Sequence, residues 1–419
     1  MKRPGGLWRH RDFLKLWSAE TVSRFGSEVS NLAIPFVAIV VLKASPFEVA
    51  LLTALLFLPF LLFALPAGVW VDRLARRPIL VVSDLVRAVA LASIPLAYAL
   101  DALTMWQLYV VGFVVGIGTV FFDVAYQSYL PSLVGRDQLV DGNSKLMLSY
   151  SSSQVAGPGL AGALIGLFGA AAAVLVDAVS FVASALFLAR IKTREELPPQ
   201  EQRRPMRAEL MEGFRFLLAE PRIRAIAAST MLFNFFSNVT FSIFLVYAVR
   251  VLDLGAGTIG LLFALGNVGG VAAAVFGSRI SARLGVGPTM ILGASTSLAM
   301  ILVPLAPVSQ PIPFLLASLL VTSFGVVVYN VTGISFQQEI TPDRMLGRLN
   351  ASRRFLVWGV IPLGNLVGGI LASTIGLRPT LFVGAIGIML GALPLIFSPL
   401  RSLGPSQSPA SASASSAQA

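Results

Sequence analysis

A stripe of polar side chains crosses the first apolar segment of the chain, residues 19–42. The stripe consists of Glu20, Arg24, Ser27, Glu28 and Asn31. This spacing of three and four places them on one face of a helix, and polar groups inside a membrane are costly and usually functional. Glu28 lies near mid-segment, where loss of water favours the protonated carboxyl group. We expect Glu28 to load and release a proton near neutral pH; the alternative is a static ion pair with Arg24.

Three more apolar segments, near 105–130, 222–249 and 311–335, carry polar side chains within or next to them. These residues are Thr119, Asp123, Tyr126, Gln127, Thr230, Asn234, Ser237, Asn238, Thr322, Tyr329, Asn330 and Gln337. Polar side chains in a membrane mostly face a bundle interior or a water-filled cavity. The pattern therefore predicts a substrate cavity. The residues expected to line it are Arg24, Asn31, Tyr126, Asn234, Asn238, Tyr329 and Asn330.

The residues that enzymes use for catalysis are scarce. The chain has no cysteine and one histidine, His10, which we expect to be a solvated residue of the basic N-terminal arm rather than a ligand. The sequence contains no phosphate-binding loop, metal-ligand cluster or nucleophile–base set. We therefore expect no enzymatic activity, no metal and no cofactor.

The composition is that of a membrane protein. The chain is 56 % hydrophobic and 12 % charged, with mean hydropathy +0.82, whereas a soluble domain carries about 25 % charged residues. A spanning helix needs roughly 20 apolar residues. Twelve segments are long enough, near 19–42, 49–70, 78–100, 105–130, 143–166, 168–190, 222–249, 257–278, 287–307, 311–335, 351–374 and 379–398. We predict an all-α membrane protein with 12 transmembrane helices and short loops.

The net charge of +11 is distributed unevenly along the chain. Most Lys and Arg residues lie in the termini and in every second loop, and the alternate loops hold only Lys43, Arg250 and Arg378. Positive loops face the cytoplasm. This bias predicts a multi-pass protein of the inner (plasma) membrane with both termini cytoplasmic. It indicates the lipid bilayer, and not nucleic acid, as the environment of the positive charge.

The second half of the chain repeats the first. Asn143, Gly157 and Gly162 recur as Asn350, Gly364 and Gly369. Two parallel six-helix halves are typical of one large class of secondary transporters, with the binding site near the midplane. We predict a bundle over 1–190, a cytoplasmic linker with an amphipathic helix over 191–221, a bundle over 222–400 and a disordered tail over 401–419.

Residues 68–77 read Gly-Val-Trp-Val-Asp-Arg-Leu-Ala-Arg-Arg, between two membrane-length segments. This run resembles the signature loop of the major facilitator superfamily, and it implies that superfamily's two pseudo-symmetric six-helix bundles. The resemblance also implies that the loop controls which way the transporter opens. The gating residues would be Gly68, Asp72, Arg73, Arg76 and Arg77. For Asp123 it favours a charge relay with Arg76; the alternative is direct contact with proton or substrate.

A second motif, Ala-Gly-Pro-Gly-Leu-Ala-Gly over 156–162, resembles the antiporter motif of exporters in this superfamily. Its expected residues are Gly157, Pro158 and Gly162; the alternative is simple tight packing. Because Asn365 replaces the proline in the second half, a bulky residue at Gly364 is expected to be milder than one at Gly157. The chain departs from many proton-driven exporters at Gly112, where those carry an arginine.

Over nearly all of 1–400 the chain resembles the drug and siderophore exporter branch, with macrolide efflux proteins and the enterobactin exporter. The resemblance rests on the runs 12–17, 83–88, 212–217 and 347–350. It implies a monomer that exports amphipathic small molecules by alternating access, with proton antiport through Glu28 and Asp123. The alternatives are an importer or lysolipid flippase of the same fold, and a membrane sensor that does not transport.

Overall fold

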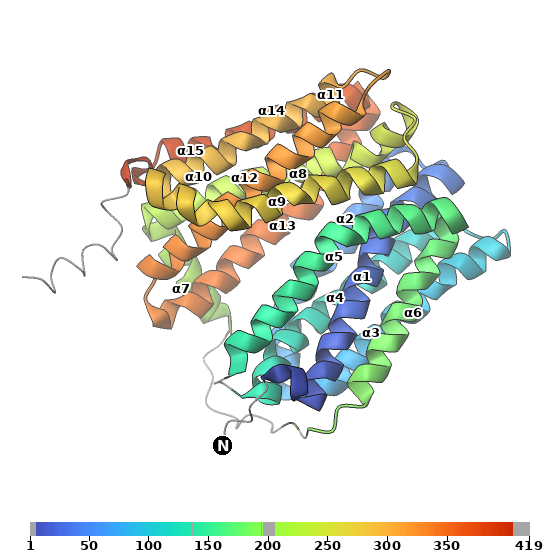
Figure 1. The fold of residues 1–419 in the computed structure, drawn as a ribbon, viewed down its shortest axis with the longest axis horizontal. Helices are drawn as coiled ribbons and strands as arrows, with labels where there is room; N and C mark the ends of the chain where they lie inside the picture. The colour runs from blue at the N-terminus through green and yellow to red at the C-terminus, as the bar shows by residue number, and fades with distance from the viewer. Residues whose placement is uncertain (1–5, 136–137, 194, 196–205, 405–419) are drawn as a thin grey trace, which may run out of the picture. The chain divides into compact units, whose positions relative to one another are not determined.

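Helices make up nearly all of the described chain, in which no β-strand occurs (Figure 1). The structure is a computed structural model that describes residues 6–135, 138–193, 195 and 206–404. For residues 65, 69, 72, 206–210, 343 and 344 it describes the backbone but not the side-chain environment. The expectation of a disordered tail falls mainly on 405–419, which lie outside the described residues.

Packing divides the chain into two compact units. Unit 1 comprises Met1–Glu201 and Ala248–Ala264. Its helices are η1 (Leu7–Arg9), α1 (Arg11–Phe36), the π-helical turn η2 (Val37–Val41), α2 (Pro46–Arg73), α3 (Arg76–Ala99), α4 (Met105–Val134), α5 (Leu139–Phe168) and α6 (Ala170–Ala189). The segment 248–264, which joins two helices of the second half of the chain, therefore packs with the first half.

Unit 2 comprises Gln202–Tyr247 and Leu265–Ala419. Its helices are α7 (Met206–Ala219), α8 (Pro221–Arg250), α9 (Ala256–Leu284), α10 (Val286–Ser295), η4 (Thr296–Ile301), α11 (Leu302–Leu305), α12 (Ile312–Ile340), α13 (Asp343–Ile375), α14 (Leu377–Leu390), α15 (Leu393–Ile396) and η5 (Pro399–Ser402). The pieces α10, η4 and α11 form one span, as do α14 and α15. Helices α8 and α9 each contribute residues to both units.

Eleven helical stretches of the described chain are long and apolar enough to cross a membrane. Helix α5 is not among them, although its 30 residues match the other spans in length. It carries polar side chains such as Asn143 and Gln154 and several glycines, and these lower its hydropathy. With α5 as the twelfth span, the predicted all-α membrane protein is confirmed.

Several helices begin well before the apolar window that the sequence shows. Helix α1 starts at Arg11 because His10 caps it: the His10 Nδ1 accepts a hydrogen bond from the Phe13 amide at 3.0 Å. A capping side chain satisfies an amide that has no partner within the helix. The structure thus gives the single histidine a local structural role.

Glycines let the helices of unit 1 approach each other closely. A Cβ atom at Gly26 of α1 would collide with Asp177 of α6. At Gly118 of α4 it would lie 2.7 Å from the Arg87 Cγ of α3. Small residues at such crossings allow backbone-to-side-chain contact between spans. These crossings therefore bring the charged side chains of α3 and α6 into the interior of the unit.

Helix α7 packs on α13 in unit 2 through one face. A Cβ atom at Gly213 would collide with the Arg348 backbone, and the Arg348 Nη1 donates to the Glu212 Oε2 at 2.7 Å. Leu217 is buried on this face, whereas Leu218 on the other side is exposed. The helix is therefore amphipathic, with its apolar contacts on α13.

At the far end of α8, Arg250 binds η2 and the turn that follows it, within unit 1. The Arg250 Nη2 donates to the Ala44 carbonyl at 2.6 Å and to the Ile39 carbonyl at 3.4 Å. Carbonyl groups at a helix C-terminus lack partners within the helix, and a charged donor makes the stronger kind of hydrogen bond. The guanidinium thus connects the end of α8 to the turn between η2 and α2.

We predict that Arg250→Ala lowers the free energy of unfolding by about 1.5–3 kcal/mol, the usual contribution of hydrogen bonds to a charged group. The measurement is the thermal unfolding midpoint of the purified protein in detergent. Lys43→Ala is the matched control, since Lys43 is an exposed cation on the neighbouring turn. Equal losses for both variants would show that the carbonyl contacts contribute nothing.

Candidate functional site

The polar stripe of α1 meets α4 and α5 at Arg24. The Arg24 Nε donates to the Glu20 Oε1 at 2.5 Å, and the Arg24 Nη2 lies 4.0 Å from the Asp123 Oδ1 of α4. Glu20 is only 4 % exposed. The guanidinium also lies 5.6 Å from the ring centroid of Tyr150 on α5. Arg24 is therefore a cation shared by two carboxylates, and its side chain is still 36 % exposed.

Glu28, one turn further along α1, has a neutral partner. The Gln154 Nε2 of α5 donates to the Glu28 Oε1 at 2.9 Å. Among the described residues, no Lys or Arg nitrogen lies within 4.0 Å of the Glu28 carboxylate. Arg24 is directed to Glu20 and Asp123 instead. The geometry therefore does not support the static ion pair between Glu28 and Arg24.

Gly157 and Pro158 lie where α5 crosses α1, and Gly157 makes room for Glu28. A Cβ atom at Gly157 would lie 2.6 Å from both the Cβ and the Cγ of Glu28. Gly162, by contrast, faces the start of α9, with its hypothetical Cβ 2.6 Å from the Ala256 carbonyl and 3.1 Å from the Gly260 Cα. The two glycines of the motif thus serve different contacts, both within unit 1.

The expectation that Gly364 tolerates a larger residue better than Gly157 does not fit the structure. A Cβ atom at Gly364 of α13 would lie 3.0 Å from the Asn238 Cβ of α8 and would collide with the Phe235 carbonyl. The absence of a proline at Asn365 does not loosen this crossing, because backbone carbonyl contact sets the spacing. Both glycines are needed for close approach.

Three more charged residues are buried in unit 1. Asp84 and Arg87 of α3 form an i,i+3 ion pair, and the Arg87 guanidinium lies 4.6 Å and 4.0 Å from the ring centroids of Phe122 and Phe181. Asp177 of α6 is 1 % exposed, and its Oδ1 accepts from the Ser180 hydroxyl at 3.0 Å. These contacts fix α3 and α6 within the unit.

The loop between α2 and α3 is tied to the start of the connector. Glu195 accepts from the Arg76 amide at 2.7 Å and from the Arg76 Nη1 at 2.9 Å. The Arg77 Nε donates to the Leu188 carbonyl of α6 at 3.1 Å. The partner that the structure gives Arg76 is thus Glu195, in place of the predicted relay with Asp123. A carboxylate at the first turn of α3 is also favoured by the helix dipole.

The other residues of the loop motif lie at the end of α2. Gly68 is half-buried in the helix, and Arg73, its last residue, is exposed. Asp72 lies in the last turn of α2, and its side chain is outside the part of the chain that the structure describes.

The polar residues of unit 2 connect α8 with α12 and α13. The Tyr329 hydroxyl of α12 lies 2.8 Å from the Thr230 hydroxyl of α8. The Asn234 Nδ2 donates to the Val357 carbonyl of α13 at 3.0 Å, and the Asn238 Nδ2 donates to the Asn234 carbonyl at 2.7 Å. These side chains are half-buried, and their hydrogen bonds join α8 to α12 and α13.

Two predicted cavity residues are exposed, and a third, Tyr126, lies beside Arg24 and Asp123. Asn31 and Asn330 are exposed. Tyr126 of α4 stacks on Phe122 with ring centroids 6.0 Å apart, and its hydroxyl has no hydrogen-bond partner among the described residues. Its neighbour on the same helix, Asp123, lies beside Arg24. The structure therefore brings Arg24, Asp123 and Tyr126 together from α1 and α4.

Sequence reasoning missed the partners that come from other helices. Tyr150 and Gln154 occupy i and i+4 on α5 and meet Arg24 and Glu28, while Glu195 meets Arg76. The spacing of Tyr150 and Gln154 is a usable signal, since two polar residues one turn apart form one helix face. No signal marks Glu195, which lies in a charged connector.

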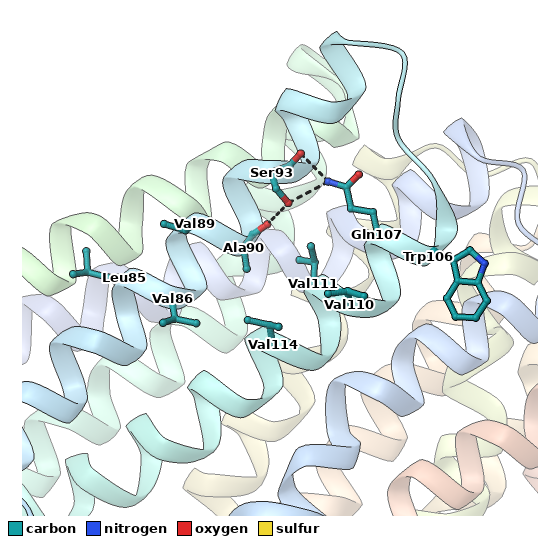
Figure 2. Close-up of a pocket in the computed structure, with 10 residues that line it drawn as sticks. All are labelled: Leu85, Val86, Val89, Ala90, Ser93, Trp106, Gln107, Val110, Val111 and Val114. Carbon is teal, nitrogen blue, oxygen red and sulfur yellow. Dashed lines mark hydrogen bonds between the residues drawn. The ribbon is translucent and has the colours of Figure 1, made fainter.

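One hollow of unit 1 lies away from these residues, between α3 and α4 (Figure 2). It has a volume of about 760 Å³ and is lined mainly by apolar side chains, such as Val86 and Val110. Its polar members bind each other: the Gln107 Nε2 donates to the Ser93 carbonyl at 2.9 Å. The groove offers no charged group and is not a candidate for proton chemistry.

The described residues thus form twelve membrane-length helices in two compact units, with paired charges in the interior of the spans, as expected for the fold of the major facilitator superfamily. The family model described as "Transmembrane secretion effector" matches residues 6–417. The chain belongs to this family, within the major facilitator superfamily, which confirms the predicted fold and the predicted exporter branch.

Relatives of known function resemble the chain over most of its length. It is 28 % identical to the multidrug efflux pump Tap of Mycolicibacterium fortuitum, over 83 % of this chain and 86 % of the relative. It is 24 % identical to macrolide efflux protein A of Streptococcus pyogenes, over 87 % and 90 %. It is 25 % identical to the enterobactin exporter EntS of Escherichia coli O1:K1, over 89 % and 87 %.

Among solved structures, a bacterial homologue of the iron transporter ferroportin in its inward-facing state has the same fold. The TM-score is 0.74 and the identity 19 %, with 94 % of this chain and 99 % of the other covered. At this identity the likeness establishes the fold alone. The family and the structural neighbour are transporters, not enzymes.

We predict that Gly157→Ala lowers the free energy of unfolding by about 1–3 kcal/mol, the usual cost of overpacking, because the added methyl group meets Glu28. Gly159→Ala is the matched control on the same helix, since its Cβ would lie at an ordinary 3.6 Å from Ala264. Thermal unfolding of both variants checks this. A Gly157→Ala variant as stable as Gly159→Ala would mean that α1 and α5 do not cross as described.

We also predict an energetic coupling between Arg76 and Glu195. Each change to Gln leaves a buried charge without its partner, so the double variant should lose about 0.5–3 kcal/mol less than the sum of the single losses. Unfolding midpoints of the four proteins measure the coupling. The exposed Arg73 serves as control: Arg73→Gln combined with Glu195→Gln should be additive, and coupling of the same size there would argue against a specific pair.

Proposed function

We propose that the protein is a proton-coupled exporter of amphipathic small molecules in the inner membrane, with Glu28 as its proton-carrying residue. The observation that carries the proposal is the contact between Glu28 and Gln154 at 2.9 Å within a span, where no cationic nitrogen of the described residues lies within 4.0 Å of the Glu28 carboxylate. The names of the relatives, which are exporters of drugs, macrolides and enterobactin, support export and the substrate class.

The charge balance in the spans of unit 1 favours proton binding. Away from the helix ends, these spans contain more carboxyl groups than guanidinium groups. The carboxyl groups belong to Glu20, Glu28, Asp84, Asp123 and Asp177, and the guanidinium groups to Arg24 and Arg87. An unpaired ionised carboxylate is costly in a low-dielectric interior and is relieved by taking up a proton. Since Glu20 and Asp84 hold the two guanidiniums, Glu28 is among the carboxyl groups left to protonate.

Gln154 suits a partner that changes its protonation state. Its amide N–H donates to the ionised Glu28 carboxylate, and after a flip of the amide its carbonyl oxygen accepts from the protonated carboxyl group. Glu28 therefore keeps a hydrogen bond in both protonation states, and its partner Gln154 is neutral in both. A lysine or arginine in that place would hold Glu28 ionised and prevent proton release and uptake.

The Glu20–Arg24–Asp123 cluster is the proposed contact of proton and substrate in unit 1. Arg24 is shared between Glu20 at 2.5 Å and Asp123 at 4.0 Å, so the more distant carboxylate is the one a cationic substrate group would engage first. The Tyr126 hydroxyl adds an unused hydrogen-bonding group beside it. This set suits a bulky, partly apolar molecule with a positive or hydroxyl-bearing end.

For the gating motif we propose that the α2–α3 loop controls alternating access, in a monomer with both termini in the cytoplasm. The contacts of Arg76 and Arg77 with Glu195 and with the end of α6 support a loop held by its own unit. A unit that moves as a rigid body during alternating access needs such contacts within itself. The importer or lysolipid flippase of the same fold remains the rival of this class, and the non-transporting sensor the rival of another.

We predict that Glu28→Gln abolishes export driven by a pH gradient while the protein remains folded, because Gln cannot release a proton but still bonds Gln154. Uptake of ethidium and erythromycin into everted vesicles, in which cellular export becomes movement into the lumen, measures this under an imposed gradient, and thermal unfolding checks the fold. Glu339→Gln, at an exposed site on α12, is the matched control and should export normally. Wild-type export rates in Glu28→Gln would exclude Glu28 as the coupling residue.

The same vesicles separate the rival functions. A proton-coupled exporter accumulates both compounds inside the everted vesicles only when the gradient drives protons out of the lumen. A proton-coupled importer accumulates them only under the opposite gradient. A sensor binds the compounds, as seen by a shift in unfolding temperature, yet moves none of them under either gradient.

A further inference from the structure

The acidic residues of the two sequence halves are distributed very differently. Within 222–400 the chain contains only Asp253, Glu339 and Asp343, and none of these lies in the middle of a span. Arginine is nevertheless present well inside α13, at Arg353 and Arg354. A guanidinium in a span normally pairs with a carboxylate or a backbone carbonyl, so the partners of these two arginines are informative.

Arg353 and Arg354 differ in what they contact. The Arg354 guanidinium lies 4.7 Å from the ring centroid of Trp358, one turn along the same helix. The half-buried Arg353 donates from Nη1 to the Gln337 Oε1 of α12 at 2.9 Å. No carboxylate oxygen of the described residues lies within 4.0 Å of the Arg353 guanidinium. Arg353 is thus a partly buried cation held by a neutral amide.

Gln337 brings a second unused donor to the same place. It is 4 % exposed, and its Nε2 has no hydrogen-bond partner among the described residues. The orientation of the amide is fixed by Arg353, because a guanidinium only donates and must face the carbonyl oxygen. The amide N–H group therefore remains beside the guanidinium without an acceptor, and an unsatisfied buried donor costs about 1–3 kcal/mol.

Neighbouring polar groups do not supply the missing acceptor. The Tyr329 hydroxyl on α12 is engaged with Thr230 at 2.8 Å and the Ile226 carbonyl at 3.1 Å. Asn234 donates to the Val357 carbonyl, one turn beyond Arg353. These groups are satisfied by each other and by the backbone, and none is anionic. Tyr329 and Asn234 therefore leave the Gln337 Nε2 without an acceptor.

We infer that Arg353 and Gln337 form a binding site in unit 2 for the anionic group, a carboxylate or sulfonate, of an amphipathic small molecule. One oxygen of that group accepts from the Arg353 guanidinium and the other from the Gln337 Nε2, which satisfies both donors. Charge-assisted bonds of this kind are about twice as strong as neutral ones. The inference rests on the proposed function for its ligand class, and it extends that class to molecules with an acidic group.

Binding of two matched probes to the purified full-length protein tests the site: benzoate, and its neutral analogue benzamide. A ligand that binds the folded state raises the unfolding temperature by mass action. We expect benzoate to raise it with a saturable dependence on concentration and benzamide to leave it unchanged. Arg353→Gln should weaken the apparent affinity for benzoate at least tenfold, whereas Arg354→Gln should change it less than twofold.

Gln337→Glu gives a second variant that keeps the fold and blocks the site, since it provides Arg353 with an internal carboxylate. It should unfold at or above the wild-type temperature and no longer respond to benzoate. Equal responses to benzoate and benzamide, or equal losses in Arg353→Gln and Arg354→Gln, would overturn the site. This readout needs no transport. If the wild-type protein binds benzoate but shows no export driven by a pH gradient, the proposed function is wrong and the site stands. If it exports under a gradient but does not bind benzoate, the site is wrong and the proposed function stands.

Discussion

The cost of holding charge in a medium that excludes water governs the interior of this protein. A charged side chain inside a span must be paired, neutralised or connected to an aqueous path. Asp84 pairs with Arg87, and Glu20 pairs with Arg24. Once these pairs are made, the spans of unit 1 have no further guanidinium away from the helix ends. Asp123 shares Arg24 with Glu20, and Glu28 is bonded by the neutral amide of Gln154. Because carboxyl groups outnumber guanidinium groups in these spans, a proton is the group that can neutralise the excess.

Glycine makes these arrangements possible by setting how closely the helices approach. Gly157 allows α5 to cross α1 directly over Glu28, which brings Gln154 within hydrogen-bonding distance of it. Gly118 makes room for the Arg87 side chain that reaches Asp84. Close approach between spans relies on packing, since lipid is as apolar as the side chains. The same glycines that hold the fold together therefore determine which polar groups meet.

The two halves of the chain share a helical plan and differ in charge. Carboxylates in the middle of the spans belong to the first half, and the second half places Arg353 in α13 without an acidic partner among the described residues. In the first half the unmatched groups are acids, which a proton can neutralise. In the second half the unmatched group is a guanidinium, which does not release its proton in proteins and so needs an anion. Pseudo-symmetry of the backbone thus supports two chemically different sites.

The sequence by itself determined the class of the protein and its helical plan. Long apolar segments, few charges and the loop at 68–77 are enough for a twelve-helix transporter, because in lipid every backbone group must be satisfied within a helix. The polar stripe of α1, with Glu28 in it, follows from helical periodicity alone. The i,i+3 pair of Asp84 and Arg87 was also visible, since both partners lie on one helix.

Contacts between helices were decided only by the tertiary structure. Arg76 binds Glu195 and not Asp123, Glu28 bonds Gln154 and not Arg24, and Gly157 faces Glu28 while Gly162 faces α9. The rotation and depth of one helix against another are set by many small packing contacts distributed over distant parts of the chain. A local pattern reports which face of a helix is polar, and it does not report which face of which neighbour lies opposite.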